Sequence, residues 1–277
     1  MTGLLTEMAA SSARRVRAAR AQVDEDALRA RCATLPPPPP LALAANGFDV
    51  IAELKLRSPS LGDLSAHTVD PVARLTAYAT GGAAACSILT EPSRFDGALE
   101  HLRSAALALA PLGVPVMRKD FLVDPYQVLE ARAQGAGGVL LILRMVSRRK
   151  LQALLDEAAA QGLFALLEAF DAADLELAGE LAAERAGRGG QVLLGLNCRD
   201  LGTLEIDVDR FERLRGALPQ AWPAVAESGV TTPAEAARVA ALGYRAALVG
   251  TSLMRSEDPA RAVREFVAAG RAAVATA

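Results

Sequence analysis

Lysine is rare in this chain, and its positions mark the side chains best suited to transfer protons. Among 30 basic residues only three are lysine, namely Lys55, Lys119 and Lys150. A guanidinium stays protonated near neutral pH, whereas an amine can be tuned to titrate, so a lysine kept in an arginine-rich background is a candidate acid or base. Lys150 follows two arginines on an expected helix surface. Lys55 and Lys119 are therefore the two candidates.

Acidic side chains accompany these lysines at the ends of short apolar runs. Glu53 precedes Lys55 by two residues, so both side chains lie on one face of an extended strand. Glu168 and Glu227 end two later runs, and Asn197 ends another. Any one of these glutamates alone could be a structural ion-pair partner. Together, paired Lys and Glu in a low-dielectric site acquire shifted pKa values and suit general acid–base catalysis without a metal or cofactor.

Eight apolar runs of strand length must position these residues, and stretches with helical spacing separate them. The runs cover residues 48–54, 84–89, 115–119, 138–143, 164–169, 192–197, 224–228 and 246–250. Continuous apolar strands that alternate with helices predict a buried parallel sheet, and eight such units in about 230 residues predict an α/β fold, the (β/α)8 TIM barrel. A doubly wound open sheet is the alternative, but no glycine-rich phosphate loop follows the first run. In a barrel the active site lies at the carboxyl ends of the strands, where the candidates fall.

The loops after the seventh and eighth runs contain small residues suited to an anion. Ser228 and Gly229 follow one run, and Gly250 and Thr251 follow the other. Glycine lets backbone N–H groups approach an anion, and barrels often hold a phosphate between these two loops. We therefore expect a phosphorylated small molecule as substrate.

Composition narrows the class of protein. The chain has 277 residues, a formal net charge of −2 and a hydrophobic fraction of 52%. A near-neutral globular chain offers no electrostatic surface for nucleic acid or an acidic membrane, and no apolar run reaches the roughly 18 residues of a membrane span. Three widely spaced cysteines disfavour a disulfide framework or a zinc site, and His67 and His101 stand in no triad-like pattern. With no secretory leader evident, we expect a cytoplasmic protein.

The N-terminal residues 1–47 are expected to form a segment of their own ahead of a barrel at 48–277. Residues 4–31 have the apolar spacing of one amphipathic helix, and the run from Pro36 to Pro40 predicts a stiff, extended connector. Two interpretations are open: a tail with a spacer, or an extra helix packed over one end of the barrel.

Several segments of the chain resemble the indole-3-glycerol-phosphate synthase family. They are IAELKLRSPS, SILTEPSRFDG, PVMRKDFLVDPYQVLEARAQGAGGVLLI, LLEAF, GLNCRDL, VAESGV and LVGTSLMRSEDP, in barrel order. The resemblance implies a barrel whose extra N-terminal helix lies across the catalytic end. It also implies that 1-(2-carboxyphenylamino)-1-deoxyribulose 5-phosphate is cyclised with loss of CO2 and water in tryptophan biosynthesis. We expect a monomer, with other tryptophan-pathway enzymes as possible partners.

The resemblance further implies catalytic roles. Lys119 would be the general acid in ring closure, and Glu168 the matching base or acid in dehydration. Glu53 and Asn197 would polarise and orient the substrate, and Glu227 would complete the catalytic set.

The same resemblance implies a set of binding residues. Lys55 would pair with the phosphate or donate a proton in the second step, and Arg199 would support the mouth of the site electrostatically. The residues that would line the ribulose phosphate are Ser58, Ser228, Gly229, Gly250 and Thr251.

Five positions depart from the family's usual residues, and none of them removes a proposed catalytic group. They are Leu56, Leu61, Ala98, Phe170 and Cys198. They bear on substrate affinity more than on the reaction.

Three other functions compete with this interpretation. A phosphoribosylanthranilate isomerase is expected to use a Cys/Asp pair, but the first strand has no cysteine. A Schiff-base aldolase would use Lys55 or Lys119 as its nucleophile. A catalytically silent or altered phosphate-binding barrel in a specialised indole pathway would have no reason to keep clustered charges, which are costly to bury.

Overall fold

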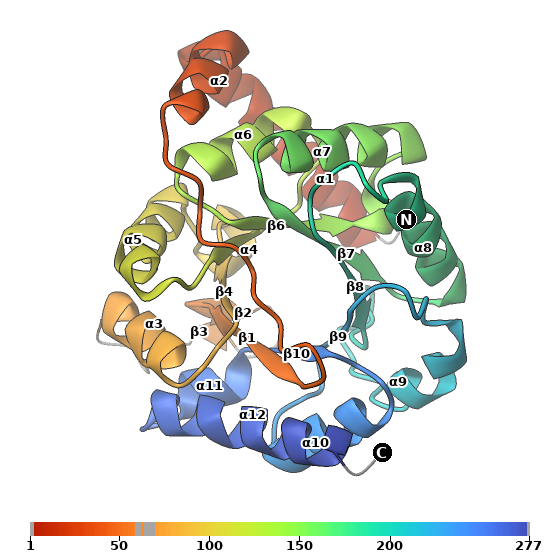
Figure 1. The fold of residues 1–277 in the computed structure, drawn as a ribbon. Coiled ribbons are helices and arrows are strands. Elements are labelled where there is room, and N and C mark those ends of the chain that lie inside the picture. The colour runs from red at the N-terminus through yellow and green to blue at the C-terminus, as the bar shows by residue number, and fades with distance from the viewer. Residues whose placement is uncertain (1–2, 59–61, 64–69, 276–277) are drawn as a thin grey trace.

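Eight parallel strands close into a barrel, which confirms the predicted fold class. The computed structural model describes residues 3–58, 62–63 and 70–275. Around the barrel the strands follow the order β1-β10-β9-β8-β7-β6-β5-β4, and β4 pairs with β1 to close the ring (Figure 1). The strands are β1 (Asp49–Leu54), β4 (Ala85–Leu89), β5 (Val116–Lys119), β6 (Gly138–Ile142), β7 (Phe164–Ala169), β8 (Val192–Asn197), β9 (Ala224–Glu227) and β10 (Ala246–Val249).

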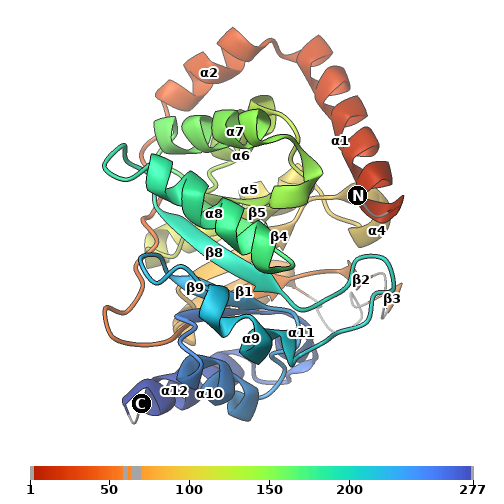
Figure 2. The same ribbon diagram turned by 90° about the vertical axis from the view of Figure 1, so that its right-hand side faces the viewer.

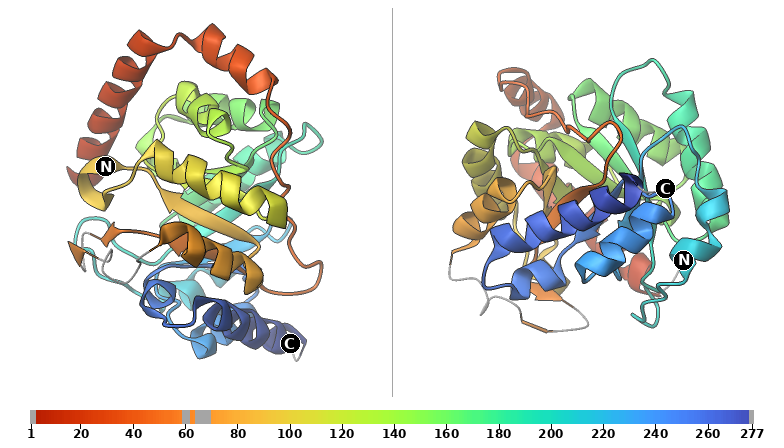
Figure 3. Two further views of the ribbon diagram at one scale, coloured as in Figure 1. Left: turned by 90° about the vertical axis from the view of Figure 1, so that its left-hand side faces the viewer. Right: turned by 60° about the horizontal axis from the view of Figure 1, so that its bottom comes forward.

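Helices alternate with the strands and cover the outside of the barrel. They are α3 (Pro71–Thr80), α5 (Leu99–Leu109), α6 (Pro125–Ala133), α7 (Arg148–Ala160), α8 (Ala172–Glu184), α9 (Arg210–Arg213), α10 (Pro233–Ala241) and α12 (Pro259–Ala275). Helices α10 and α12 lie side by side against β10 and β1 (Figure 3). Asp70, Asp124 and Thr232 each cap a helix that begins with proline, so the sequence itself marks where these loops end.

Short elements lie at the ends of the strands and of some helices. They are the hairpin β2 (Arg57–Ser58) and β3 (Gly62–Asp63), the helices α4 (Pro92–Phe95) and α11 (Thr251–Arg255), and the 3-10 turns η2 (Ala110–Leu112), η3 (Leu143–Met145) and η4 (Arg215–Ala217). Leu61 and His67 lie outside the described residues, as does the side chain of Ser58.

The N-terminal segment forms two helices, so the prediction of one helix over residues 4–31 is wrong. Helix α1 (Gly3–Gln22) ends before Asp24, and α2 (Glu25–Ala33) begins after it. The Asp24 side chain accepts a hydrogen bond from the Ala27 N–H at 2.7 Å, so it caps a new helix instead of continuing the first. The chain turns there, and α2 packs beside α6 (Figure 2).

This N-terminal segment contacts the barrel at both ends. Leu5 and Met8 of α1 are buried with Phe121, which follows the carboxyl end of β5. Leu41, from the connector, is buried in the same cluster, and Figures 1 and 2 show the connector crossing the end opposite α1. The second interpretation of the segment is therefore confirmed, because α1 is an extra helix over the catalytic end.

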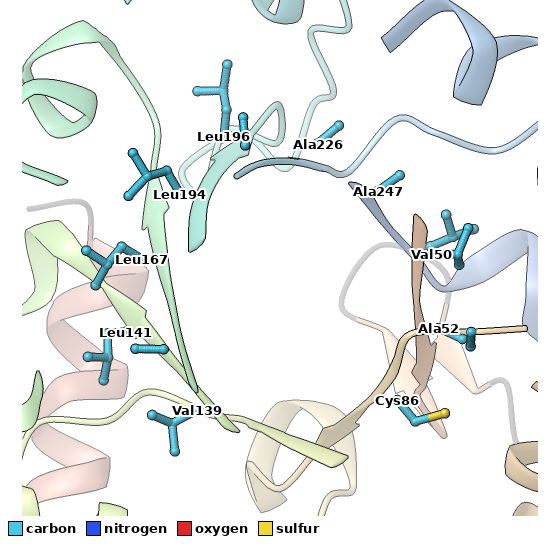
Figure 4. Packing of buried hydrophobic residues seen from close by; sticks show 14 of the residues in the cluster. Val50, Ala52, Cys86, Val139, Leu141, Leu167, Leu194, Leu196, Ala226 and Ala247 are labelled. Atoms are coloured by element: carbon cyan, nitrogen blue, oxygen red, sulfur yellow. The ribbon is translucent and has the colours of Figure 1, made fainter. Parts of the chain in front are cut away.

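Side chains along the strands alternate between two apolar clusters. The outward residues labelled in Figure 4, such as Val50, Leu141 and Leu194, point away from the barrel and pack under the helices. The inward residues, such as Met117 and Leu166, fill the barrel interior. All three cysteines are free and buried. Within the described ranges, no helix is long and apolar enough to span a membrane.

Ala98 sits where a capping side chain would stabilise helix α5. It is the N-cap residue, with extended backbone at φ −150° and ψ 155°, and alanine has no side-chain oxygen to accept a helix N–H. We expect Ala98→Ser to raise the free energy of unfolding by about 1 kcal/mol. Urea denaturation of the two proteins measures this difference. An Ala98→Val variant, which adds volume without an oxygen, is the control and should bring no such gain.

Candidate active site

Four charged side chains form one layer across the top of the barrel. They come from β1, β5, β7 and β9, which are alternate strands of the closed ring, and they are Glu53, Lys119, Glu168 and Glu227. Such four-membered layers are the normal packing unit of the TIM barrel, where branched apolar residues usually fill them. The glutamate side chains are at most 6% exposed and that of Lys119 is 17% exposed. A buried polar layer in this place indicates a chemical role.

Lys119 reaches across the barrel to two of the carboxylates. Its Nζ lies 3.1 Å from Glu227 Oε2 and 3.8 Å from Glu168 Oε1. The Asn197 side-chain amide donates a hydrogen bond to the same Glu168 oxygen at 2.5 Å. A second ion pair joins Lys55 Nζ to Glu53 Oε1 at 3.0 Å. The structure thus brings together all six residues predicted as catalytic.

Burial and mutual charge shift the titration of this layer. Burial alone would lower the pKa of Lys119, but the carboxylates of Glu227 and Glu168 outweigh it and hold that pKa above its ordinary value. Burial likewise opposes ionisation of Glu53, yet Lys55 and Lys119 keep its pKa below the ordinary value. Burial raises the pKa of Glu227 to about 8, and the charge of Glu168 adds to this effect while Lys119 opposes it. The layer therefore offers a charged amine beside a carboxyl that titrates near neutrality, which suits proton transfer.

A cavity opens above the layer, and many of the residues that line it are apolar. Phe95 and Phe121 contribute rings whose centroids are 6.3 Å apart. The other apolar lining residues are Leu4, Leu89, Leu140, Ile142, Leu201, Leu204, Ile206, Val230 and Leu248. These apolar side chains suit an aromatic group. Leu4 belongs to α1, so the N-terminal helix forms part of the site.

The cavity lining also includes four of the predicted anion-binding residues. Ser228, Gly229, Gly250 and Thr251 all line the cavity. Ser228 and Gly229 have φ values of 61° and 93°, so this turn adopts a left-handed backbone that a glycine accommodates and a serine rarely does. Strain of this kind is typical of ligand-binding loops.

Arg199 holds the loop that follows β8. Its backbone N–H donates to Asn197 Oδ1 at 2.9 Å, and its Nη1 donates to the Leu204 carbonyl at 2.9 Å. Leu204 has a φ of 63° and lines the cavity. Arg199 therefore holds in place a loop residue that forms part of the cavity lining.

Asp120 is the residue of the site that sequence reasoning missed, although it follows Lys119 directly. Its carboxylate accepts hydrogen bonds from both terminal nitrogens of Arg15 at 2.7 and 2.8 Å, from Arg118 at 3.0 Å and from Thr90 at 2.8 Å. Burial opposes its ionisation, but Arg15 and Arg118 hold the pKa of Asp120 well below its usual range. Arg15 belongs to α1, so this carboxylate attaches the N-terminal helix to the residue beside Lys119.

Two of the residues that depart from the family's usual pattern, Cys198 and Phe170, are buried. Burial raises the pKa of the Cys198 thiol to about 12, so this cysteine is not a nucleophile at neutral pH. Phe170 is buried, and the Arg144 guanidinium lies 4.9 Å from its ring centroid. Within the described parts of the chain, no group of His, Cys, Asp and Glu side chains is arranged to hold a metal ion.

Comparison with solved structures finds proteins of similar fold. The chain is similar to a thiamine phosphate pyrophosphorylase from Pyrococcus furiosus, with a TM-score of 0.55 and 16% identity over 82% of this chain and 96% of that one. It is also similar to 3-hexulose-6-phosphate synthase from Salmonella typhimurium, with a TM-score of 0.58 and 13% identity over 80% of this chain and 97% of that one. At such identities the likeness concerns the fold alone.

Comparison of sequences, unlike that of structures, identifies the family of the chain. The family model described as indole-3-glycerol phosphate synthase matches residues 5–266. The protein of that name from Nocardioides sp. is 46% identical over 86% of this chain and 88% of its own length. Those from Mycobacterium leprae and Mycobacterium tuberculosis are 43% and 40% identical, over 83% and 92% of this chain and 80% and 90% of theirs. The chain therefore belongs to the indole-3-glycerol phosphate synthase family.

Proposed function

We propose that this chain is a decarboxylating lyase that converts 1-(2-carboxyphenylamino)-1-deoxyribulose 5-phosphate into indole-3-glycerol phosphate in tryptophan biosynthesis. The observation that carries the proposal is the buried layer in which Lys119 lies between Glu168 and Glu227. The cavity above it matches the substrate in kind, because its lining includes apolar side chains for the aromatic ring and the small residues of two loops for the phosphate.

The reaction requires proton transfers at two stages. In the first, the ring carbon that bears the carboxylate attacks the ribulose carbonyl, a C–C bond forms and the carbonyl oxygen takes a proton. The C–C bond to the carboxylate then breaks, and CO2 leaves as the ring becomes aromatic again. In the second stage the new hydroxyl leaves as water, and the methylene carbon next to the nitrogen loses a proton, so that a C=C bond completes the pyrrole ring. The first stage therefore needs an acid at the carbonyl oxygen, and the second needs an acid at the departing hydroxyl and a base at the methylene carbon.

The layer supplies these groups from different strands of the barrel. Lys119 is the proposed acid for the carbonyl oxygen, and Glu168, oriented by the Asn197 amide, is the proposed base or acid of the dehydration. Glu53 is proposed to polarise and orient the substrate, and Lys55, its ion-pair partner, to donate a proton in the second step or to contact phosphate beside Gly250. Arg199, Ser228, Gly229, Gly250 and Thr251 are the proposed binding residues, and Ser58 remains one from sequence alone.

The raised pKa of Glu227 predicts how kcat/KM should depend on pH. Because its pKa is raised to about 8, its carboxyl carries a proton below that pH and is charged above it. We expect the free-enzyme profile of kcat/KM to show an inflection near pH 8 that disappears in Glu227→Gln, together with a higher KM. Steady-state rates between about pH 6 and pH 10 measure this. Glu176→Gln, on the exposed face of α8, is the control, and an inflection that persists in Glu227→Gln would assign it to another group.

The direct test is fluorescence of indole-3-glycerol phosphate formed from the carboxyphenylamino-deoxyribulose phosphate, with neither metal nor cofactor added. Turnover in the native protein supports the proposal. Absence of turnover with tight substrate binding would reject it in favour of a silent binding barrel. Borohydride treatment in the presence of substrate adds a check, since a covalent lysine adduct would indicate Schiff-base chemistry instead.

We also propose that the protein acts as a cytoplasmic monomer. Three free, buried cysteines suit a reducing compartment, and every side chain of the charged layer comes from one chain. Analytical ultracentrifugation tests the oligomeric state, and the same method with other tryptophan-pathway enzymes tests for partners.

A further inference from the structure

A glycine in β8 faces the carboxyl of Glu227. Gly195 is buried and lies two residues before Asn197, so by strand alternation both positions face the barrel interior. Gly195 is paired in register with Glu168 on one side and with Val225 on the other. Because Val225 comes two residues before Glu227, Gly195 lies beside the base of the Glu227 side chain, just below the charged layer.

The space that a side chain at position 195 would need is filled by Glu227. A Cβ atom at Gly195 would lie 2.0 Å from Glu227 Oε1, 3.1 Å from Glu227 Cδ and 3.2 Å from Leu166 Cδ1. No real Cβ approaches a carboxyl oxygen to 2.0 Å, so even alanine would force the carboxyl to move. Gly195 belongs to a regular strand, a conformation that any residue adopts. Space, and not backbone conformation, therefore requires glycine here.

The absence of a side chain at Gly195 leaves a slot, and one carboxyl oxygen of Glu227 occupies it. The two oxygens of this carboxyl therefore have different surroundings. Oε2 lies 3.1 Å from Lys119 Nζ, in the direction of the cavity. Oε1 is buried above Gly195 and has no hydrogen-bond partner among the described residues. A buried carboxyl oxygen without a partner is costly, so a side chain held in this way is held by the shape of its surroundings.

We propose that Gly195 is a positioning residue for catalysis, because its missing side chain forms the slot that seats the Glu227 carboxyl below the substrate and directs Oε2 toward Lys119. The proposal rests on the proposed function and extends it to a residue that contacts no substrate. Without the slot, the Glu227 carboxyl would have to rise toward the cavity, where Glu168 and the substrate lie. Such a shift would disturb both the Lys119 ion pair and the volume left for the substrate.

The first experiment is Gly195→Ala, compared with Gly216→Ala. Gly216 is exposed in η4, and among the described atoms a Cβ there would meet nothing within 4 Å, so its replacement controls for the change of glycine to alanine. We expect kcat/KM to fall about 100-fold in Gly195→Ala, as for a misplacement of about 1 Å in a catalytic group. We also expect the inflection near pH 8 to move to lower pH, because a displaced Glu227 carboxyl is better solvated.

A double-mutant cycle separates positioning from a purely structural role. The probe is the substrate reduced with borohydride at its carbonyl, which cannot cyclise and can therefore be titrated against inactive variants. We expect Gly195→Ala to weaken its binding about 10-fold in the native background and by no more than about 2-fold beside Glu227→Ala, where the clashing carboxyl is gone. Equal losses in both backgrounds, or no loss in the native one, would overturn the proposal.

Whether the variants fold also tests the positioning role of Gly195. If Gly195→Ala alone does not fold, the proposal requires that Gly195→Ala with Glu227→Ala does fold, and failure of both overturns it. If the native protein shows no turnover, the proposed function fails. The seating of Glu227 is then still tested by the folding comparison and by an NMR titration of its carboxyl in the native protein and in Gly195→Ala.

Discussion

Replacing Lys119 by arginine is expected to lower kcat at least about 100-fold, the lower range for loss of a general acid. Arginine keeps the positive charge that Glu227 and Glu168 require, but its guanidinium does not release a proton in the working pH range. The neighbouring carboxylates already hold the pKa of Lys119 above its ordinary value, so its proton moves only when negative charge develops on the substrate oxygen. Steady-state kinetics at saturating substrate measures the effect.

The matched control is Lys150→Arg. Lys150 lies on helix α7, where it forms an ion pair with Asp124 at 3.2 Å and its side chain is 41% exposed. Since this pair depends on charge alone, the variant should keep native kcat. If Lys119→Arg instead retains more than about a tenth of native turnover, Lys119 acts by electrostatic stabilisation and not as a proton donor.

The largest effect on stability is expected from Asp120→Asn, a loss of about 3–5 kcal/mol in the free energy of unfolding at neutral pH. Asp120 has a fully buried carboxylate that pairs with Arg118, whose side chain is 2% exposed, and with Arg15 of the N-terminal helix. An amide of the same shape leaves these cations without their shared negative charge. Denaturant unfolding measures the change. Asp209→Asn, which removes one partner of an exposed ion pair with Arg238, should leave the free energy of unfolding nearly unchanged.

The same carboxylate predicts an acid sensitivity. The pKa of folded Asp120 lies below its unfolded value of about 3.9, so its stabilising contribution is complete above that pH and is lost as the pH falls toward the folded pKa. Stability of the native protein should therefore drop below about pH 4, and Asp120→Asn should lack this part of the drop. A variant as stable as Asp209→Asn at neutral pH would contradict the assigned role.

Local patterns in the sequence were sufficient to predict the barrel and its charged layer. Each strand is a short apolar run, and the chemistry-bearing residues stand at run ends, where barrel geometry alone brings Glu53 and Glu227 into one layer. The scarcity of lysine added a second, independent indication for Lys55 and Lys119. These features depend on spacing within a strand, which the sequence displays directly.

Other features depend on contacts between distant parts of the chain, which spacing does not display. The break in the N-terminal helix was missed because the apolar spacing continues past Asp24. The Asp24 side chain accepts a hydrogen bond from the Ala27 N–H, and this cap separates α1 from α2. The contacts of Asp120 with Arg15 join residues 105 positions apart. The slot at Gly195 was missed because a strand glycine reveals its purpose only when the side chain above it is known.

The attachment of α1 through Asp120 has a consequence for synthesis on the ribosome. Helix α1 is made before the barrel strands, and the carboxylate that Arg15 binds is made 105 residues after Arg15. At about 5–20 residues per second, translation takes roughly 5–20 s to cover that distance. During this interval Leu5 and Met8 have no native surface against which to pack, because their apolar cluster includes residues of β5 and later strands. Helix α1 therefore cannot dock when it is made, and until it docks the nascent chain carries an exposed apolar face that chaperones can bind.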